Sequence, residues 1–336
     1  MPIIHFLNVN DGDCSVIEHA SGRITVIDVC NAKTSNLIKE ARSALDAAAE
    51  TGISGNFKQR DYPVNPVTYM QNRGITSVFR FILTHSDMDH MDGLSVFFDA
   101  FKPVNFWDTD SDSEKDFGTR GGGYDEEDWD FYQSIKASSE GPKRLVLYSG
   151  SKGQYWNKNE KGESGGDGLQ VLAPTPELVR QANESGDYND CSYVILYRTS
   201  SDHTILFSGD SHDKTWDHIL SKHEDLVKDV DVLIAPHHGR TSDRSFEFLD
   251  VVNPGLTLFG NANSAHLAYA PFNNRGLPKI TNNQAGSVLV DADGETIHVY
   301  VSCEAFARRS NPQTAESSYY EGYYYWGPVK SRKKSG

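Results

Sequence analysis

Short apolar runs rich in β-branched residues recur along the chain, and clusters of Gly, Asn, Asp and Ser separate them. Runs of this length and composition, bounded by turn residues, are typical of strands. We therefore expect strands over Ile3–Val9, Cys14–Glu18, Ile24–Val29, Val78–Leu83, Arg144–Tyr148, Leu169–Leu172, Tyr193–Arg198, Thr204–Phe207, Val230–Ala235, Leu256–Phe259, Ser287–Val290 and Thr296–Val301.

Longer segments with helical composition fall between some of these runs. The Ala- and Leu-rich segment Asn36–Glu50 ends near a glycine, and Asn65–Gly74 begins with an Asn-Pro pair that suits a helix N-terminus. Helices are also expected over Trp216–Glu224 and Arg244–Leu249. Strands outnumber helices and alternate with them irregularly, which predicts an α/β protein of packed sheets with outer helices.

Composition narrows the class of protein. The chain has 336 residues and a formal net charge of −15, and no apolar run reaches the roughly 18 residues that a membrane span needs. Its four cysteines are scattered, which predicts no disulfide framework and favours the cytoplasm. We expect no membrane partner and no non-specific binding of nucleic acid through a broad basic surface.

The acidic charge is concentrated in one segment. Residues 108–130 hold ten acidic residues against Lys115 and Arg120. With the triglycine 121–123 in its middle, this stretch predicts a solvated loop insertion over about residues 105–130.

The C-terminal segment differs in composition from the rest. Residues 306–336 are dense in Tyr and end in a basic run, so we expect a main domain over 1–305 followed by a tail. The tail could clamp nucleic acid, because aromatic rings stack on bases and cations neutralise phosphates. Packing on the domain surface and a protein or homodimer contact are the alternatives.

The strongest chemical signal follows the run Val78–Leu83. Within six positions the chain places His85, Asp87, Asp89 and His90, directly after an expected buried strand. Imidazole and carboxylate groups are the ligands that hold hydrolytic metal ions. A turn at the end of a strand can point such side chains at one spot, so we expect a metal site here.

Two other expected strands end in similar residues. Thr204–Phe207 leads into Gly209 and Asp210, and Val230–Ala235 leads into the pair His237 and His238. A carboxylate at a strand end can bridge two metal ions. Each pattern by itself is weak evidence for a metal site, and the alternative interpretation is a solvated turn.

The order of these patterns resembles the metallo-β-lactamase superfamily of metal-dependent hydrolases. It is most similar to the hydrolase domain of ComEC-type DNA-uptake proteins and its soluble relatives, through the opening run Phe6–Asp13, the strand Ile24–Asp28 and the run Ala235–Gly239. The resemblance covers about residues 3–302. It implies a four-layer αββα sandwich, with two packed mixed β-sheets and outer helices.

The resemblance also implies roles for single residues. His85 and Asp87 would hold one divalent ion, and Asp89 and His90 a second. Asp210 would bridge the two ions and act with Asp89 in catalysis. One of His237 and His238 would close the second site, with the spacing from Pro236 favouring His238. Asp28 would orient a ligand, and His212 would contact the substrate.

Some positions depart from the superfamily pattern. Asp87 stands where the second His is usual, which adds an oxygen ligand and suits Mn²⁺ as well as Zn²⁺. No His occurs at the third motif, so the first site is either incomplete or completed by Asn189 or Asp190. His266 lies in a degraded copy of a later motif and is a candidate ligand or proton donor.

The resemblance implies hydrolysis by a metal-bound hydroxide at a dinuclear site, as in a phosphodiesterase or nuclease with a nucleic acid or nucleotide substrate. Two alternatives remain open. The protein could hydrolyse a small ester, thioester or lactam. It could also be a catalytically impaired, metal-binding regulatory module, because the third-motif His is missing.

Overall fold

The computed structural model describes residues 1–33, 56–117, 124–242, 244–262 and 265–333. The expected helix Asn36–Glu50 and the triglycine 121–123 lie outside the described residues. Within the described part, the strands form one sheet of nine and one sheet of six.

The larger sheet has the order β15-β14-β13-β1-β2-β3-β4-β5-β6. The strands β3 to β6 run parallel, and the pairs from β15 to β3 are antiparallel, so the sheet is mixed. Its strands are β1 (Ile3–Phe6), β2 (Ser15–Glu18), β3 (Ile24–Ile27), β4 (Arg80–Ile82), β5 (Asn105–Trp107), β6 (Lys143–Leu145), β13 (Val288–Asp291), β14 (His298–Val301) and β15 (Tyr324–Pro328).

The smaller sheet has the order β12-β11-β10-β9-β8-β7 and is also mixed. The strands β9 to β12 are parallel, and β7 and β8 add to them in antiparallel fashion. Its strands are β7 (Leu169–Ala173), β8 (Val194–Arg198), β9 (Thr204–Phe207), β10 (Val232–Ile234), β11 (Leu256–Phe259) and β12 (Lys279–Thr281).

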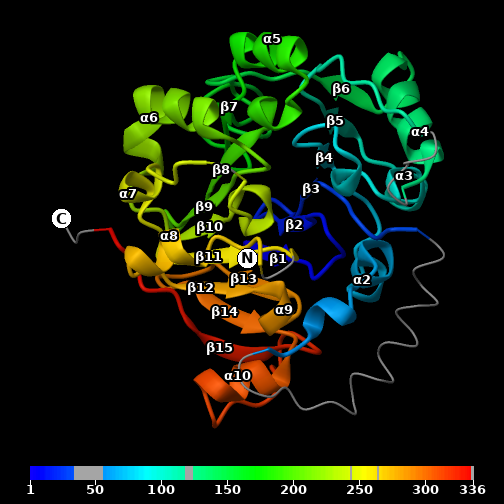
Figure 1. Cartoon of the computed structure of the whole chain (residues 1–336). Helices are drawn as coiled ribbons and strands as arrows, with labels where there is room; N and C mark the ends of the chain where they lie inside the picture. Colours follow the sequence, from blue (N-terminus) through cyan, green and yellow to red (C-terminus); the bar gives the residue numbers. More distant parts are fainter. Residues whose placement is uncertain (34–55, 118–123, 243, 263–264, 334–336) are drawn as a thin grey trace.

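Helices cover the outer faces of both sheets (Figure 1). In Figure 1, α2, α3 and α4 lie on one side of the strands, and α6, α7 and α8 lie on the other. The α-helices are α2 (Pro66–Asn72), α3 (Leu94–Phe101), α4 (Glu126–Ala137), α5 (Pro176–Ser185), α6 (Asp213–Val227), α7 (Leu249–Val252), α8 (Tyr269–Asn274), α9 (Asn282–Ala285) and α10 (Glu304–Ser310).

Three hydrophobic clusters hold these layers together. The central one lies between the sheets, where Ile82 and Trp107 of the larger sheet pack with Phe207 and Leu258 of the smaller one. The two other clusters lie between each sheet and its helices. Because both faces of the parallel strands are buried, the sequences of these strands are continuous apolar runs. The predicted αββα class, with two packed mixed sheets and outer helices, is confirmed.

The expectation of a solvated acidic loop over residues 105–130 is wrong at both ends. Asn105–Trp107 forms β5 inside the larger sheet, and α4 begins at Glu126. Asp108 is buried and accepts hydrogen bonds from Tyr132 (2.9 Å) and Arg144 Nε (3.0 Å). Buried carboxylates are tolerated when they are paired in this way, and charge counting along a sequence cannot detect the pairing.

Two helix predictions have opposite outcomes. The helix expected over Trp216–Glu224 is confirmed as part of α6. The helix expected over Arg244–Leu249 is wrong, because residues 244–248 are irregular and α7 begins only at Leu249. The Arg244 side chain is instead buried and donates a hydrogen bond to the Ser211 carbonyl (2.7 Å).

The aromatic part of the C-terminal segment belongs to the larger sheet. Tyr324–Pro328 forms β15, which pairs with β14. Tyr320 and Tyr323 are buried, and the Tyr323 hydroxyl lies 2.8 Å from the hydroxyl of Tyr69. Lys333 Nζ lies 2.8 Å from Asp231 Oδ2. Packing of the aromatic residues on the domain, one of the expected alternatives, is what the structure shows.

No helix in the described ranges combines the length and the apolar character needed to cross a membrane.

A chain that ends after Asn311 should unfold more easily than the full chain. It loses β15 and the buried Tyr320 and Tyr323. Burial of one large side chain stabilises the fold by about 1.5–3 kcal/mol, and the shortened chain lacks this contribution from both tyrosines. We expect the free energy of unfolding to fall by at least about 3 kcal/mol, measured by urea denaturation. A chain that ends after Val329 keeps β15 and is the control. Equal stability of the two shortened chains would contradict the structural role of β15.

Candidate metal centre

Three strands bring the candidate ligands together from both sheets. His85 follows β4 of the larger sheet, and His90 lies in the short 3-10 helix η2 (Met88–His90) just beyond. Asp210 follows β9 of the smaller sheet. The pair His237 and His238 lies in η4 (Pro236–Gly239), directly after β10. Because β9 and β10 are parallel neighbours, their carboxyl ends place these residues at one edge of the sheet.

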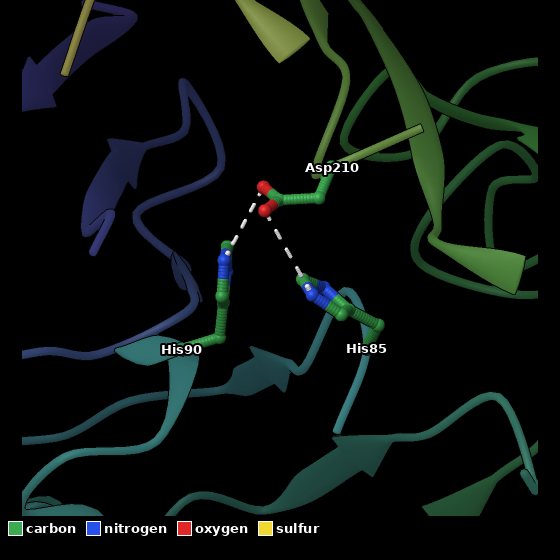
Figure 2. A group of neighbouring side chains, drawn as sticks. All are labelled: His85, His90 and Asp210. Atoms are coloured by element: carbon green, nitrogen blue, oxygen red, sulfur yellow. Dashed lines mark ion pairs between the residues drawn. The ribbon is translucent and has the colours of Figure 1, made fainter. Parts of the chain in front are cut away.

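The Asp210 carboxylate is the centre of this group (Figure 2). His90 Nε2 lies 3.3 Å from Asp210 Oδ1, and His85 Nε2 lies 4.0 Å from Asp210 Oδ2. His237 Nε2 and His238 Nε2 lie 3.5 and 3.6 Å from that same Oδ2 atom. Figure 2 shows the rings of His85 and His90 pointing at the carboxylate.

The facing atoms are buried but have no hydrogen-bond partner among the described residues. This holds for the Nε2 atoms of His85, His90 and His238 and for Asp210 Oδ1. Ligand atoms held at 2.0–2.2 Å from one tetrahedral ion lie about 3.3–3.6 Å apart, close to most of the separations observed here. Buried polar atoms without partners are rare and need an explanation. The arrangement therefore fits a divalent metal ion.

Two overlapping groups of residues have this metal-ligand geometry. His85, His90 and Asp210 form one group, and Asp89, His90 and His238 form the other. Asp89 Oδ2 lies 3.3 Å from His238 Nε2. The donor set thus contains imidazole and carboxylate groups from three strand ends, as the sequence predicted.

Asp28 contacts the Nδ1 side of the His90 ring and orients it. Its Oδ2 atom lies 2.8 Å from His90 Nδ1, and its two oxygens accept hydrogen bonds from the Thr84 amide and hydroxyl (both 2.7 Å). Contact at Nδ1 leaves His90 Nε2 free to face Asp210. This is the position that was predicted for Asp28.

Asp13 lies beside the equivalent nitrogen of His238, but without a described hydrogen bond between the two atoms. Its Oδ1 atom lies 3.1 Å from His238 Nδ1, on the side of the ring away from Asp89. The turn around Asp13 must approach the site closely. A Cβ added at Gly12 would lie 1.7 Å from the Asp89 carbonyl oxygen, and one added at Gly260 would lie 2.7 Å from Asp13 Oδ1.

The two neighbouring histidines differ in their surroundings. His238 is fully buried, whereas the side chain of His237 is 18% exposed and lies beside His212, with 6.0 Å between ring centroids. Both have left-handed backbone conformations, with φ of 51° and 56°. Such conformations are strained for residues with a Cβ and are found at functional sites. The burial and the Asp13 contact favour His238 as a ligand.

The electrostatics of the cluster are dominated by buried charges. Burial would lower the pKa of His90, but the Asp210 and Asp28 carboxylates raise it well above its usual value. In the same way Asp210 and Asp13 outweigh burial and raise the pKa of His238 to about 10. Burial raises the pKa of Asp210, and the charges of His238 and His90 outweigh it and hold the pKa well below the usual range. The carboxylates of the cluster thus favour positive charge next to them, either as protons on His90 and His238 or as a bound cation.

Asp87 lies at the more exposed side of the centre. Its Oδ2 atom is 3.5 Å from His85 Nε2, and its Oδ1 atom is 2.6 Å from Lys115 Nζ. Burial would raise the pKa of Asp87, but contacts with His85 and Lys115 lower it well below its usual value. Asp87 is therefore an ionised oxygen donor that already has one cationic partner.

The remaining predicted site residues lie farther from the cluster. Asn189 belongs to η3 (Tyr188–Cys191), and no described contact joins its side chain to a candidate ligand. His212 Nδ1 lies 3.4 Å from Asp187 Oδ2, beside His237. His266 is exposed, and its described contact is a backbone hydrogen bond from Thr241 to its carbonyl (2.8 Å). The structure thus places His212 near the centre and shows no contact of His266 with it.

Sequence reasoning missed three neighbours of the centre. Asp13 ends the opening motif, so its position in that motif was the available signal. Lys115 lies in the acidic segment, and its pairing with Asp87 had no local signal. Arg244 was placed on a helix, but it donates to the carbonyls of Ser211 (2.7 Å) and Asp210 (3.4 Å).

No protein-family model matches the sequence, and no curated protein shows significant similarity to it. Solved structures are similar at low identity. The metallo-β-lactamase fold protein YhfI from Bacillus subtilis has 10% identity and a TM-score of 0.43, over 84% of this chain and 96% of that one. An isothiocyanate hydrolase from Delia radicum gut bacteria has 16% identity and a TM-score of 0.43, over 82% and 95%.

A diphosphatase of the PhnP family is a third similar structure, with 10% identity and a TM-score of 0.36, over 77% of this chain and 86% of that one. Because all three structures have low identities and TM-scores, only the chain's own residues can indicate its function.

The variant Asp28→Asn should bind metal more weakly although Asp28 is not itself a candidate ligand. The amide keeps an acceptor for the Thr84 amide but removes the charge that fixes the tautomer of His90. Loss of such an orienting carboxylate typically lowers metal affinity about 10- to 100-fold. Competition with a coloured Zn²⁺ chelator measures the change. Asp250→Asn, at an exposed ion pair with Arg275, is the matched control. Equal affinity of both variants would refute the orienting role.

Proposed function

We propose that the chain is a metal-dependent hydrolase of the metallo-β-lactamase type that cleaves phosphodiester bonds. The observation that carries this proposal is the convergence of buried, unpartnered donor atoms of His85, His90, His238 and Asp210 on one region. A divalent ion bound there would act as a Lewis acid and lower the pKa of water toward about 7.

The donors divide into two unequal sets around Asp210. Asp89, His90 and His238 would hold one ion together with Asp210. Asp210 lies 3.3 Å from His90 Nε2 and 3.6 Å from His238 Nε2, and Asp89 lies 3.3 Å from His238 Nε2. The other set has His85 and Asp87 with Asp210 Oδ2, the oxygen that His238 also faces. No described contact links Asn189 to this set, so we infer that the second set binds its ion more weakly.

Cationic side chains around the centre support a phosphate-containing substrate. Lys115 Nζ lies 2.6 Å from Asp87 Oδ1, and the guanidinium of Arg244 donates to the backbone carbonyl of Asp210 (3.4 Å). Positive charge at these positions would stabilise the negative charge of an attacked phosphodiester, whereas a neutral ester gains less from it. His212 lies next to His237 and, in this proposal, would contact the leaving group. A nucleic acid or nucleotide is the substrate class that this proposal names.

The protein loaded with Mn²⁺ or Zn²⁺ should hydrolyse a bis-aryl phosphate faster than an aryl carboxylic ester. A chelator should abolish the activity, and added metal should restore it. Asp210→Asn should lower kcat/KM by at least about 100-fold, because the group between the donor sets loses its charge. His298→Gln, on β14 in the outer part of the larger sheet, is the control.

The alternatives have distinct outcomes in this experiment. Cleavage of a carboxylic ester, thioester or lactam while single- and double-stranded DNA, RNA and cyclic nucleotides stay intact would contradict the phosphodiesterase proposal. Metal binding without any hydrolysis would instead indicate a regulatory module.

A further inference from the structure

A cavity of about 580 Å³ lies at the opposite end of β4 from the metal centre. The loop of residues 151–168 forms one wall, and the other walls come from the β2–β3 turn at His19 to Ser21 and from the end of β8. β4 begins with Arg80 behind this cavity, whereas His85 follows its other end. Five extended residues span about 16 Å, so the cavity is separate from the metal centre.

Asp167 is an acidic residue of the cavity lining, and two arginines that do not line the cavity neutralise its charge. Asp167 is buried, and its carboxylate contacts two guanidinium groups, Arg23 NH1 at 3.1 Å from Oδ1 and Arg80 NH2 at 3.1 Å from Oδ2. The Ser21 hydroxyl also donates to it (2.7 Å). One carboxylate thus balances only one of two cations, and its oxygens are already occupied by protein donors.

The rim adds two cations that no described residue neutralises. Lys152 is exposed and Lys158 is half-buried, and neither ammonium group has a described ion pair or hydrogen bond. Arg198 also lines the cavity, but Asp202 pairs with it. The cavity therefore concentrates positive charge on a chain whose net charge is −15. A partly buried cation without a counter-charge is costly, and an anion from solution would remove that cost.

The other lining groups suit the remaining parts of a small organic ligand. Ser164 and Gln170 offer a hydroxyl and an amide, and the almost fully buried Tyr197 also lines the cavity. Sites for small molecules commonly measure 300–1,000 Å³ and combine a few directed polar groups with apolar walls. A volume of about 580 Å³ exceeds what a single inorganic phosphate needs.

We propose that this cavity binds a small organic phosphate, with Lys152 and Lys158 neutralising the phosphate group. The ligand would join the 151–168 loop to the β2–β3 turn, away from the reacting groups. The proposal does not depend on the hydrolase activity, because none of its residues belongs to the metal centre.

Hydrogen exchange measured by mass spectrometry tests the proposal, with ribose 5-phosphate as the probe and sodium chloride of matched ionic strength as the reference. At about tenfold above the dissociation constant, amides covered by the ligand should exchange about tenfold more slowly. We expect this protection in peptides from residues 151–168. Inorganic phosphate, as a second probe, should protect the same peptides less.

The double variant Lys152→Gln with Lys158→Gln should lose the protection. Lys222→Gln with Lys228→Gln removes the same charge from exposed positions in and next to α6 and should keep it. Protection confined to peptides around residues 84–92 and 208–212 would place the ligand at the metal centre and overturn the proposal. So would unchanged protection in the cavity variant, no protection at all, or protection by inorganic phosphate that equals that by ribose 5-phosphate.

Discussion

The buried carboxylate of Asp210 imposes the main constraint on this fold. Four imidazole nitrogens lie within 4.0 Å of its oxygens, and they come from β4 in one sheet and β10 in the other. A buried charge is stable only when opposite charge surrounds it closely. The two sheets must therefore meet with their strand ends aligned, and the central apolar cluster that includes Ile82 and Phe207 fixes that alignment.

Two further carboxylates, which are not themselves beside Asp210, orient the candidate ligands. Asp28 and Asp13 each contact the Nδ1 atom of a candidate ligand and so direct its Nε2 atom inward. This arrangement requires the turn around Gly12 to touch the backbone of Asp89, where no side chain could fit. A set of donors oriented in this way would lose little freedom on binding an ion, and two of its histidines, His237 and His238, have strained left-handed backbone.

Much of this arrangement was predictable from sequence. Val78–Leu83, Thr204–Phe207 and Val230–Ala235 are apolar runs that end abruptly in His or Asp, and a strand with ligands at its end is the direct interpretation. Contacts between distant segments were not predictable. β5 is three residues long and precedes an acidic stretch, and Lys115 reaches Asp87 only through folding. His266 lies in a degraded motif, which made it a candidate, but the structure shows no contact between it and the cluster.

Elemental analysis measures whether these donors hold metal ions. After reconstitution with Zn²⁺ or Mn²⁺ and removal of free ions, we predict about two ions per chain, one of them lost more readily on dilution. The double variant Asp89→Ala with Asp210→Ala should retain neither ion, whereas His298→Gln should retain both. Absence of bound transition metal from the reconstituted protein, or an unchanged metal content in the double variant, would contradict the account.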